Sequence, residues 1–345
     1  MINIVGINKK LKDIIKVLET LDISYLVYCD KPCNIACSII GNYDEILKSI
    51  DNNNKTIVLT ADKRVLSHLD SSNIINLADN IVIVRGAGDL ASAVIIRLFK
   101  AGYKVLALEI EKPTLIRTNV AFATCMYSNS VVVDGVKAKK VTSLDSIYDC
   151  FNNAEVPVLV DENLSILNDI KPLVIVDAII AKRNLGLKVG MAPLTIALGP
   201  GFVCAQDADF VIETQRGHDL GRILTTGEAS KNTGIPGVIK GHGQDRVVKS
   251  LFEGVFKAKN KIGDVVTLGD TIAFVDNNEV KATMSGQLRG MLSSGLVVTK
   301  GFKVADIDPR INEFNIDNPS DKAFSIAGSV LQIIDNYLIK VNSTL

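Results

Sequence analysis

Cationic and small residues gather behind two apolar runs of the chain, in a pattern that suits anion binding. Lys182, Arg183 and Asn184 follow an apolar run that ends at Asp177, and Gly199-Pro200-Gly201 follows the next run. Guanidinium and ammonium groups neutralise phosphates, and glycine-rich backbone can hold them through its N–H groups. Ligands of open α/β sheets bind at the carboxyl ends of the strands, so these residues are candidate ligands of an anion.

A third segment adds two more cations and a His–Asp pair. Arg216 and Arg222 flank His218 and Asp219 after a predicted strand that ends at Glu213. Histidine exchanges protons near neutral pH, so His218 and Asp219 are the candidate acid–base residues. Neighbours in sequence do not automatically pair their side chains, and a solvated surface loop would carry the same residues.

A glycine-rich turn is the fourth candidate site. Gly86 permits a tight turn after an apolar run, and Gly88 lets the backbone approach a pyrophosphate at the start of a helix. Glu109 ends the next predicted strand, where an acid can bind a ribose hydroxyl. The pattern is typical of a Rossmann-type unit and leaves NAD(P) binding open, although the carboxylate of Asp89 would repel a pyrophosphate.

The composition narrows the class of protein. The chain has 38 basic and 38 acidic residues, no Trp and 5% aromatic residues, which argues against a nucleic-acid-binding surface. No apolar run reaches the roughly 18 residues that a membrane helix needs, and no secretory signal is recognised, so we expect a cytoplasmic protein. Cys29, Cys33 and Cys37 leave two readings open, a metal site or semi-buried thiols in a strand region.

Short apolar bursts predict the elements that must position these side chains. Strands are expected at 81–85 and 104–109 with a helix over 89–101 between them, and a further helix over about 114–122. Asp134-Gly135 predicts a hairpin turn. Strands that alternate with helices indicate a parallel sheet with right-handed crossovers.

The pattern changes after about residue 245, where strands punctuated by glycine replace the helices. Gly254 and Gly263 recur 32 residues later as Gly286 and Gly295, which indicates two equal β halves. These halves resemble a barrel-sandwich hybrid of the biotinyl/lipoyl type, without a carrier lysine in the hairpin at 276–279.

The expected fold class is therefore α/β, with a Rossmann-like parallel sheet, a small N-terminal α/β unit and a C-terminal β barrel-sandwich-hybrid-like domain. The expected domains are the small α/β unit (1–80), the Rossmann-like domain (81–245), the internally repeated β domain (246–310) and a C-terminal helix (311–345). That helix could dock in cis or pair in trans, so a homodimer stays open.

Seven runs of this sequence together resemble the YqeB-type accessory proteins of selenium-dependent molybdenum hydroxylases. They lie at 86–91, 113–117, 176–186, 198–202, 213–222, 233–237 and 306–310, and Glu109 and the short run 120–122 add to the resemblance. The resemblance implies a Rossmann part related to XdhC-type factors, which bind molybdenum cofactor. It further implies an accessory factor that binds molybdopterin, or its cytosine dinucleotide, and assists its modification or insertion into a hydroxylase apoenzyme.

Three hypotheses about function follow. In the first, the two glycine segments hold phosphates while Lys182, Arg183, Arg216 and Arg222 grip a molybdopterin-type ligand. In the second, the chain is an NAD(P)-dependent oxidoreductase of a small substrate, with His218 as its acid–base group. In the third, it is a non-catalytic scaffold that docks a partner through the repeated β domain.

Overall fold

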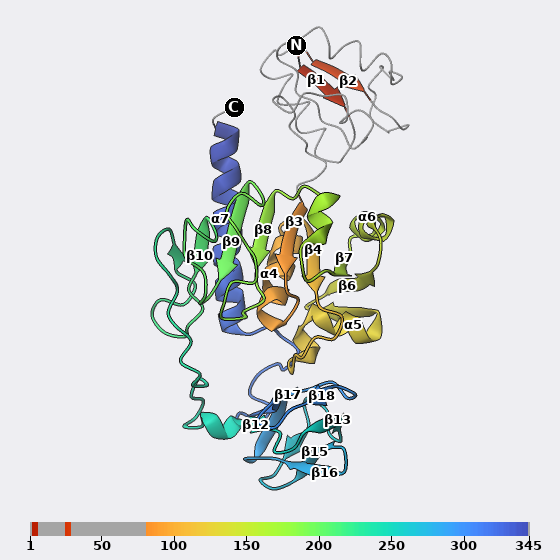
Figure 1. Ribbon diagram of the computed structural model, residues 1–345, viewed down its shortest axis with the longest axis vertical. Coiled ribbons are helices and arrows are strands. Elements are labelled where there is room, and N and C mark those ends of the chain that lie inside the picture. The colour runs from red at the N-terminus through yellow and green to blue at the C-terminus, as the bar shows by residue number, and fades with distance from the viewer. Residues whose placement is uncertain (1, 6–24, 29–80, 344–345) are drawn as a thin grey trace. The chain divides into compact units, whose positions relative to one another are not determined.

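The computed structural model describes residues 2–5, 25–28 and 81–343 (Figure 1). The chain divides into two compact units, Met1–Asn80 and Ile81–Leu345. In the first unit, β1 (Ile2–Val5) and β2 (Tyr25–Tyr28) pair in parallel. The other elements expected in the N-terminal α/β unit lie outside the described residues, as do Cys29, Cys33 and Cys37.

One nine-stranded sheet organises the second unit, in the order β11-β10-β9-β8-β3-β4-β7-β6-β5. Seven neighbouring strands run parallel: β10 (Phe210–Ile212), β9 (Leu194–Leu198), β8 (Val174–Asp177), β3 (Ile81–Arg85), β4 (Lys104–Glu109), β7 (Val156–Val160) and β6 (Val136–Val141). The two edge strands, β5 (Ser130–Val133) and β11 (Ile223–Leu224), are antiparallel to their neighbours.

The predicted fold class is therefore wrong. The sheet is mixed rather than parallel, and β8, β9 and β10 follow one another without a helix between them. Apolar runs indicate buried strands but carry little information on strand direction. The chain reverses at the hairpin between β5 and β6 and again after β10, and each reversal adds an antiparallel edge strand.

The helix expected over about 114–122 is also wrong. Short 3₁₀ turns, η3 (Thr118–Val120) and η4 (Phe122–Thr124), lead into the one-turn helix α5 (Cys125–Ser128). The N–H of Phe122 donates to Ser92 Oγ at 2.8 Å, and the N–H of Ala123 donates to Ala87 O at 2.8 Å. These tertiary hydrogen bonds use the donors that a continuous helix would need.

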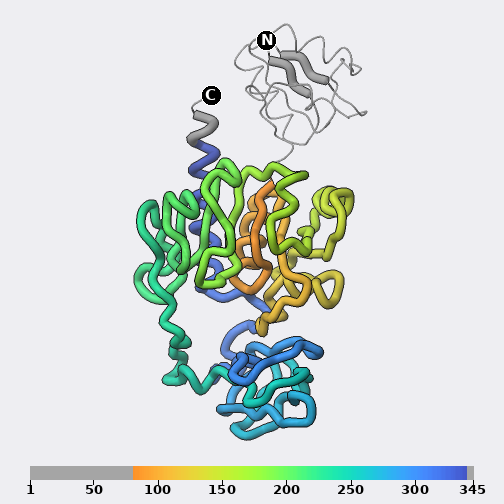
Figure 2. The backbone as a smooth tube through the Cα atoms, viewed as in Figure 1, coloured from red at the N-terminus to blue at the C-terminus, as the bar shows by residue number. Residues whose placement is uncertain are grey.

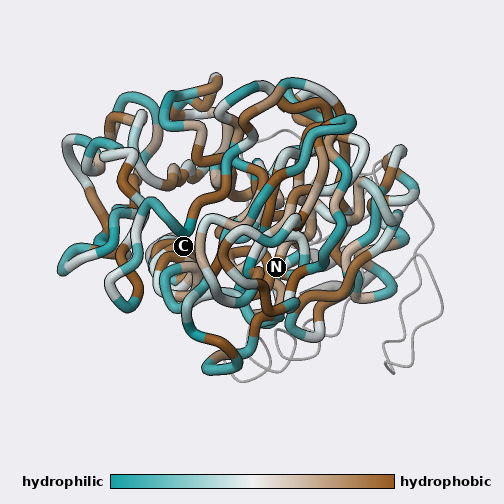
Figure 3. Tube along the Cα trace, turned by 90° about the horizontal axis from the view of Figure 1, so that it is seen from below, coloured by the Kyte–Doolittle hydropathy of each residue, from teal (hydrophilic) through white to brown (hydrophobic). Residues whose placement is uncertain are grey.

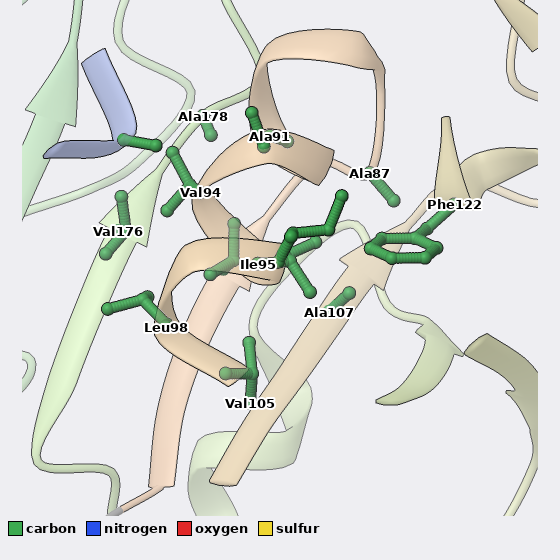
Figure 4. Close-up of a cluster of buried hydrophobic side chains, with 14 of the residues drawn as sticks. Ala87, Ala91, Val94, Ile95, Leu98, Val105, Ala107, Phe122, Val176 and Ala178 are labelled. Carbon is green, nitrogen blue, oxygen red and sulfur yellow. The ribbon is translucent and has the colours of Figure 1, made fainter. Parts of the chain in front are cut away.

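Two hydrophobic layers cover the sheet. On one face, α4 (Asp89–Lys100) packs together with α7 (Asp321–Ser343). Figure 4 shows Val94 and Leu98 of α4 near Val105 of β4 and Val176 of β8. The other face packs against α6 (Leu144–Asn152), η5 (Ser165–Asn168) and the loops around Phe202.

The second unit also contains two four-stranded antiparallel sheets, which lie within residues 246–310. We call this region the C-terminal β module. One has the order β12-β19-β17-β14 and the other β16-β15-β13-β18. Their bounds are β12 (Val247–Lys249), β13 (Gly254–Ala258), β14 (Val265–Val266), β15 (Thr271–Val275), β16 (Asn278–Lys281), β17 (Gly286–Met291), β18 (Val297–Val298) and β19 (Lys303–Asp308). The 32-residue repeat relates β13, β14 and β15 to β17, β18 and β19.

Two connections join the module to the nine-stranded sheet (Figure 2). Residues 225–246, which end in η6 (Gln244–Arg246), lead into the module, and residues 309–320 return to α7. Figure 3 shows hydrophobic and hydrophilic segments interleaved along the trace. Among the described residues, no helix combines the length and the apolar character needed to cross a membrane.

Candidate functional site

The turn between β3 and α4, residues 86–89, is tightly packed against the loop that follows β8. Gly86 has a φ of +91°, and a Cβ there would lie 3.1 Å from Ala178 O and Ile179 Cα. Its N–H donates to Leu108 O at 2.7 Å. Only glycine fits this backbone without strain, so the turn is built for close packing of the chain on itself.

The carboxylate of Glu109 holds the same turn. Its Oε2 accepts a hydrogen bond from the N–H of Ala87 at 2.8 Å, and its Oε1 accepts one from Ile110 at 2.9 Å. Burial raises the pKa of Glu109, and the two backbone hydrogen bonds oppose that shift. Asp89 Oδ1 accepts the N–H of Leu90 at 2.9 Å. Hence the predicted ribose contact of Glu109 would compete with hydrogen bonds that the protein already makes.

Beneath the turn lies a buried ion pair that the sequence did not single out. Arg85 Nη1 donates to Asp177 Oδ2 at 2.7 Å, with side chains only 3% and 1% exposed. Arg85 Nη2 also donates to the carbonyl oxygens of Glu162 and Leu185 at 3.0 and 3.2 Å. Burial raises the pKa of Asp177, and the neighbouring Arg85 opposes that shift. We call Arg85–Asp89, Glu109 and Asp177 the glycine-turn region.

The predicted ligands at 182–184 have different environments. Asn184 Oδ1 accepts the N–H groups of Gly186 and Leu187 at 2.8 Å, and its Nδ2 donates to Asp207 Oδ1 at 2.9 Å. The side chain of Asn184 therefore stabilises the conformation of its own loop. Lys182 lines a cavity of about 490 Å³. Arg183 is exposed and does not line this cavity.

The glycines after β9 are packing positions. A Cβ on Gly201 would lie 2.5 Å from the backbone N of Arg183, and one on Gly199 would lie 2.6 Å from Thr214 Oγ1. Both residues also have positive φ angles, +77° for Gly199 and +100° for Gly201. The predicted phosphate loop at 199–201 therefore packs against the chain at Arg183 and Thr214.

The candidate acid–base pair is not assembled. Asp219 Oδ1 lies 2.9 Å from Arg222 Nε in an ion pair, so Asp219 pairs with an arginine rather than with His218. His218 is exposed, and it does not line the cavity that Lys182 lines. Arg216 is held by Asp321 through two hydrogen bonds of 2.7 and 2.9 Å, so its charge is already balanced.

Among the described residues, a group of seven cations, which includes Arg216, lines two adjoining cavities. A cavity of about 620 Å³ and an adjoining one of about 440 Å³, which also touches Gly88 and Asp89, are lined by β17, β19 and the segments beside them. We call them together the cationic cleft. Its cations are Arg117, Arg216, Arg246, Arg289, Lys303, Arg310 and Lys322. Its carboxylates are Asp89, Asp306 and Asp321, so four positive charges are in surplus in a chain whose formal net charge is +0.

Arg117 is buried and Arg289 is half-buried, and neither is fully compensated. The Nε atoms of Arg117 and Arg289 are buried and have no hydrogen-bond partner within the described residues. The nearest carboxylate oxygens to Arg289 are those of Asp306 at 3.7 Å and Asp308 at 4.0 Å. Burial, together with the like charge of Arg289, lowers the pKa of Arg117 to about 10. Burial also lowers the pKa of Lys303.

A buried carboxylate fixes the other wall of the cleft. Asp308, which is fully buried, accepts from Arg310 Nε at 2.9 Å and from Arg310 Nη2 at 2.8 Å. Burial opposes the ionisation of Asp308, but the hydrogen bonds from Arg310 outweigh it and leave the pKa below its ordinary value. Arg246 donates to Asp306 at 3.3 Å and to Gly237 O at 3.1 Å.

Sequence reasoning missed the core of this cleft. Arg117 and Arg310 end two of the runs that carry the family resemblance, 113–117 and 306–310, so those runs held a signal. Arg289 and Lys303 lie on strands of the repeat and carried none. They meet Arg117 because Met291 of β17 donates its N–H to Ile116 O at 2.8 Å, a contact between residues about half the chain apart.

Comparison with curated proteins finds a relative for most of this chain. It is 47% identical over 254 residues to the uncharacterized protein YqeB of Escherichia coli (strain K12), which covers 74% of the chain. This chain is therefore similar to YqeB over about three quarters of its own length. It spans about half of that relative's length, 47%. No family model matches the sequence. The predicted resemblance is confirmed at this level, and the relation to XdhC-type factors stays a prediction.

Solved structures give only distant likenesses. Three are the ectoine utilization protein EutE (DoeB) of Ruegeria pomeroyi (14% identity, TM-score 0.21), a succinylglutamate desuccinylase of Silicibacter sp. TM1040 (12%, 0.21) and an aspartoacylase family protein of Mesorhizobium loti (9%, 0.23). Each match covers 66% of this chain and 84–85% of the other. TM-scores this low carry no argument about the fold or the site.

Proposed function

We propose that this chain binds a molybdopterin-type cofactor in the cationic cleft and assists its modification or insertion into a selenium-dependent molybdenum hydroxylase. The observation that carries the proposal is the pair of buried, unpartnered Nε atoms of Arg117 and Arg289. The nature of the cofactor comes from the family resemblance of the sequence. The hydroxylase apoenzyme is the proposed partner.

The phosphate of such a cofactor fits the residues present. A buried donor without a partner costs about 1–3 kcal/mol, and more for a charged group, so Arg117 and Arg289 destabilise the unliganded cleft. A phosphate oxygen would accept from both and offset the surplus of positive charge. Cavities of about 620 and 440 Å³ also have the size of small-molecule sites.

The residues of the cleft would hold the cofactor without taking part in metal chemistry. When bound, a molybdopterin supplies its own sulfur ligands for the metal. Arg117, Arg289 and Lys303 would hold the phosphate, and the walls of the cleft would exclude water around it. Among the described residues, no cluster of three or more His, Cys, Asp and Glu side chains is placed to hold a metal ion.

The geometry gives less support to the oxidoreductase hypothesis. Both oxygens of Glu109 bind backbone N–H groups, and His218 lies outside the cleft lining. An acid–base group must come within hydrogen-bond reach of the atom it protonates.

Native mass spectrometry of the full chain, co-expressed with a molybdenum-cofactor pathway, tests the proposal. Wild-type protein should carry a pterin phosphate or its dinucleotide, and Arg289→Ala should lose it. Arg183→Ala is the matched control, because it removes an exposed arginine outside the cleft and should keep the ligand. A bound NAD(P), or wild-type protein that carries no ligand when the cofactor is present, would contradict the proposal.

A further inference from the structure

One end of the cationic cleft differs in character from the cations at its centre. The larger cavity is also lined by Phe314 and by the amide side chains of Asn315 and Asn318. The smaller cavity, which shares Arg117 and Arg289 with it, has none of these three residues in its lining. The cleft therefore has a central cationic part and an aromatic, amide-bearing end.

The aromatic end is held rigid by the protein itself. The guanidinium carbon of Arg310 lies 4.8 Å from the centroid of the Phe314 ring. Arg310 is in turn fixed by two hydrogen bonds, of 2.8 and 2.9 Å, to the fully buried carboxylate of Asp308. A planar guanidinium on an aromatic ring, both fixed in advance, presents a flat surface at little cost in conformational entropy.

The segment that enters the module adds apolar surface to the same cavity. Pro236 and Ile239 line it, and the segment is fastened to the module because Arg246 donates to Gly237 O at 3.1 Å. Apolar walls beside a few polar groups are typical of sites for flat ring systems. Side-chain amides can both donate to and accept from the edge of such a ring.

We propose that the Phe314–Arg310 wall binds the planar heterocycle of a phosphorylated ligand, while Arg117 and Arg289 hold its phosphate. The ligand class is a heterocycle with a phosphate a few bonds away, which a pterin phosphate and a nucleotide share. The inference rests on the proposed function for the phosphate half and adds a separate ring subsite. Asn315 and Asn318 are the residues placed to read the edge of the ring.

Titration calorimetry with three probes that share a phosphate monoester separates the contribution of the phosphate site from that of the ring subsite. They are glycerol 3-phosphate, which has no ring, cytidine 5′-monophosphate and neopterin monophosphate. Stacking of a ring on an aromatic side chain should make the ring-bearing probes bind at least about fivefold tighter than glycerol 3-phosphate. The tighter of the two ring probes identifies the heterocycle as pterin or pyrimidine.

Two variants test the ring subsite. Phe314→Leu should remove most of the preference for ring-bearing probes and leave the affinity for glycerol 3-phosphate within about twofold. Asn318→Ala should narrow the difference between the two ring probes. Phe252→Leu replaces a partly exposed phenylalanine that does not line the cleft, and it should change neither affinity.

The two ideas fail in different ways. If wild-type protein binds all three probes equally tightly, or if Phe314→Leu keeps the ring preference, the ring subsite is wrong while the phosphate site stands. If none of the probes binds, or if Arg289→Ala binds glycerol 3-phosphate as well as the wild type, the proposed phosphate site fails first and the ring subsite falls with it.

Discussion

The glycine-turn region and the cationic cleft differ in how their charged groups are satisfied. In the glycine-turn region, Arg85 pairs with Asp177 at 2.7 Å, and the carboxylate of Glu109 accepts two backbone N–H groups. In the cleft, the buried Nε atoms of Arg117 and Arg289 lack hydrogen-bond partners among the described residues. In the glycine-turn region these polar groups are hydrogen-bonded within the fold. In the cleft the Nε atoms of Arg117 and Arg289 remain available to a ligand.

The difference shows why a sequence motif for binding is a weak guide to the site. The glycine-rich turn has the residue types of a phosphate loop, yet Gly86 and Ala87 already donate their N–H groups to Leu108 O and Glu109. The cleft touches this turn only through Gly88, Asp89 and Leu90. The turn is one wall of the site, and the charges that would hold an anion come from the C-terminal β module and residue 117.

The largest expected effect is a loss of folding stability when the buried ion pair of the glycine-turn region is broken. Asp177→Asn leaves Arg85 buried without its counter-charge, which typically costs about 3–5 kcal/mol. Urea unfolding should show this loss. Asp219→Asn is the control, because its partner Arg222 lies on the surface and such pairs contribute about 0–1 kcal/mol. Equal losses in the two variants would mean that the buried pair does not stabilise the fold as described.

A smaller loss of stability is expected at the turn itself. Gly86 and Gly102 share a φ of +91°, but only Gly86 has backbone atoms 3.1 Å from the position of a Cβ. Gly102→Ala should cost about 1–2 kcal/mol for the left-handed backbone alone. Gly86→Ala should cost about 1 kcal/mol more, since the neighbouring loop must move. If thermal unfolding shows no difference between them, close packing of the turn is not required.

Changes in the cleft should affect binding rather than folding. Arg289→Ala removes a half-buried cation whose buried Nε has no hydrogen-bond partner among the described residues. We therefore expect pyrophosphate affinity to fall about 10- to 100-fold, as for a lost hydrogen bond to a charged group. The melting temperature of the unliganded protein should not fall, because the buried Nε that the change removes has no hydrogen-bond partner in the described part of the fold. Arg183→Ala should bind like the wild type, and equal weakening in both variants would place the site elsewhere. The measurement is titration calorimetry with a thermal melt of each variant.

A pH titration gives the smallest expected effect. Burial lowers the pKa of Arg117 to about 10 and also lowers those of Lys303 and Lys322. These groups therefore lose their protons at a lower pH than exposed ones, and the affinity for an anion should fall severalfold as the pH approaches about 10. Sulfate is the suitable probe, because its charge is constant over this range. Arg117→Gln should show a shallower fall, and an affinity that rises with pH would contradict the assignment.

Local patterns in the sequence predicted the parts of the fold that depend on neighbouring residues. Strands β3 and β4 match the expected ranges 81–85 and 104–109, and α4 ends one residue before its expected limit. The hairpin at Asp134-Gly135 is confirmed by the pairing of β5 with β6. These elements follow from short apolar runs, from turn residues and from the residues that begin a helix. Each of these signals lies within about a dozen residues of sequence.

The sequence did not predict features that depend on contacts far apart in the chain. The direction of the edge strands depends on where the chain reverses, and apolar runs carry no sign of it. The cleft combines Arg117, Arg289 and Lys303, whose separations in sequence follow no motif. Asp177 was noted only as the end of a strand, because its partner Arg85 lies 92 residues away.

A crystal structure of the full chain with pyrophosphate tests the central claim most directly. The account predicts phosphate oxygens within hydrogen-bond distance of Arg117 Nε and Arg289 Nε, with Glu109 still bound to the N–H of Ala87. A pyrophosphate bound instead on the N–H groups of residues 86–88, with Glu109 displaced and the two arginines untouched, would contradict it.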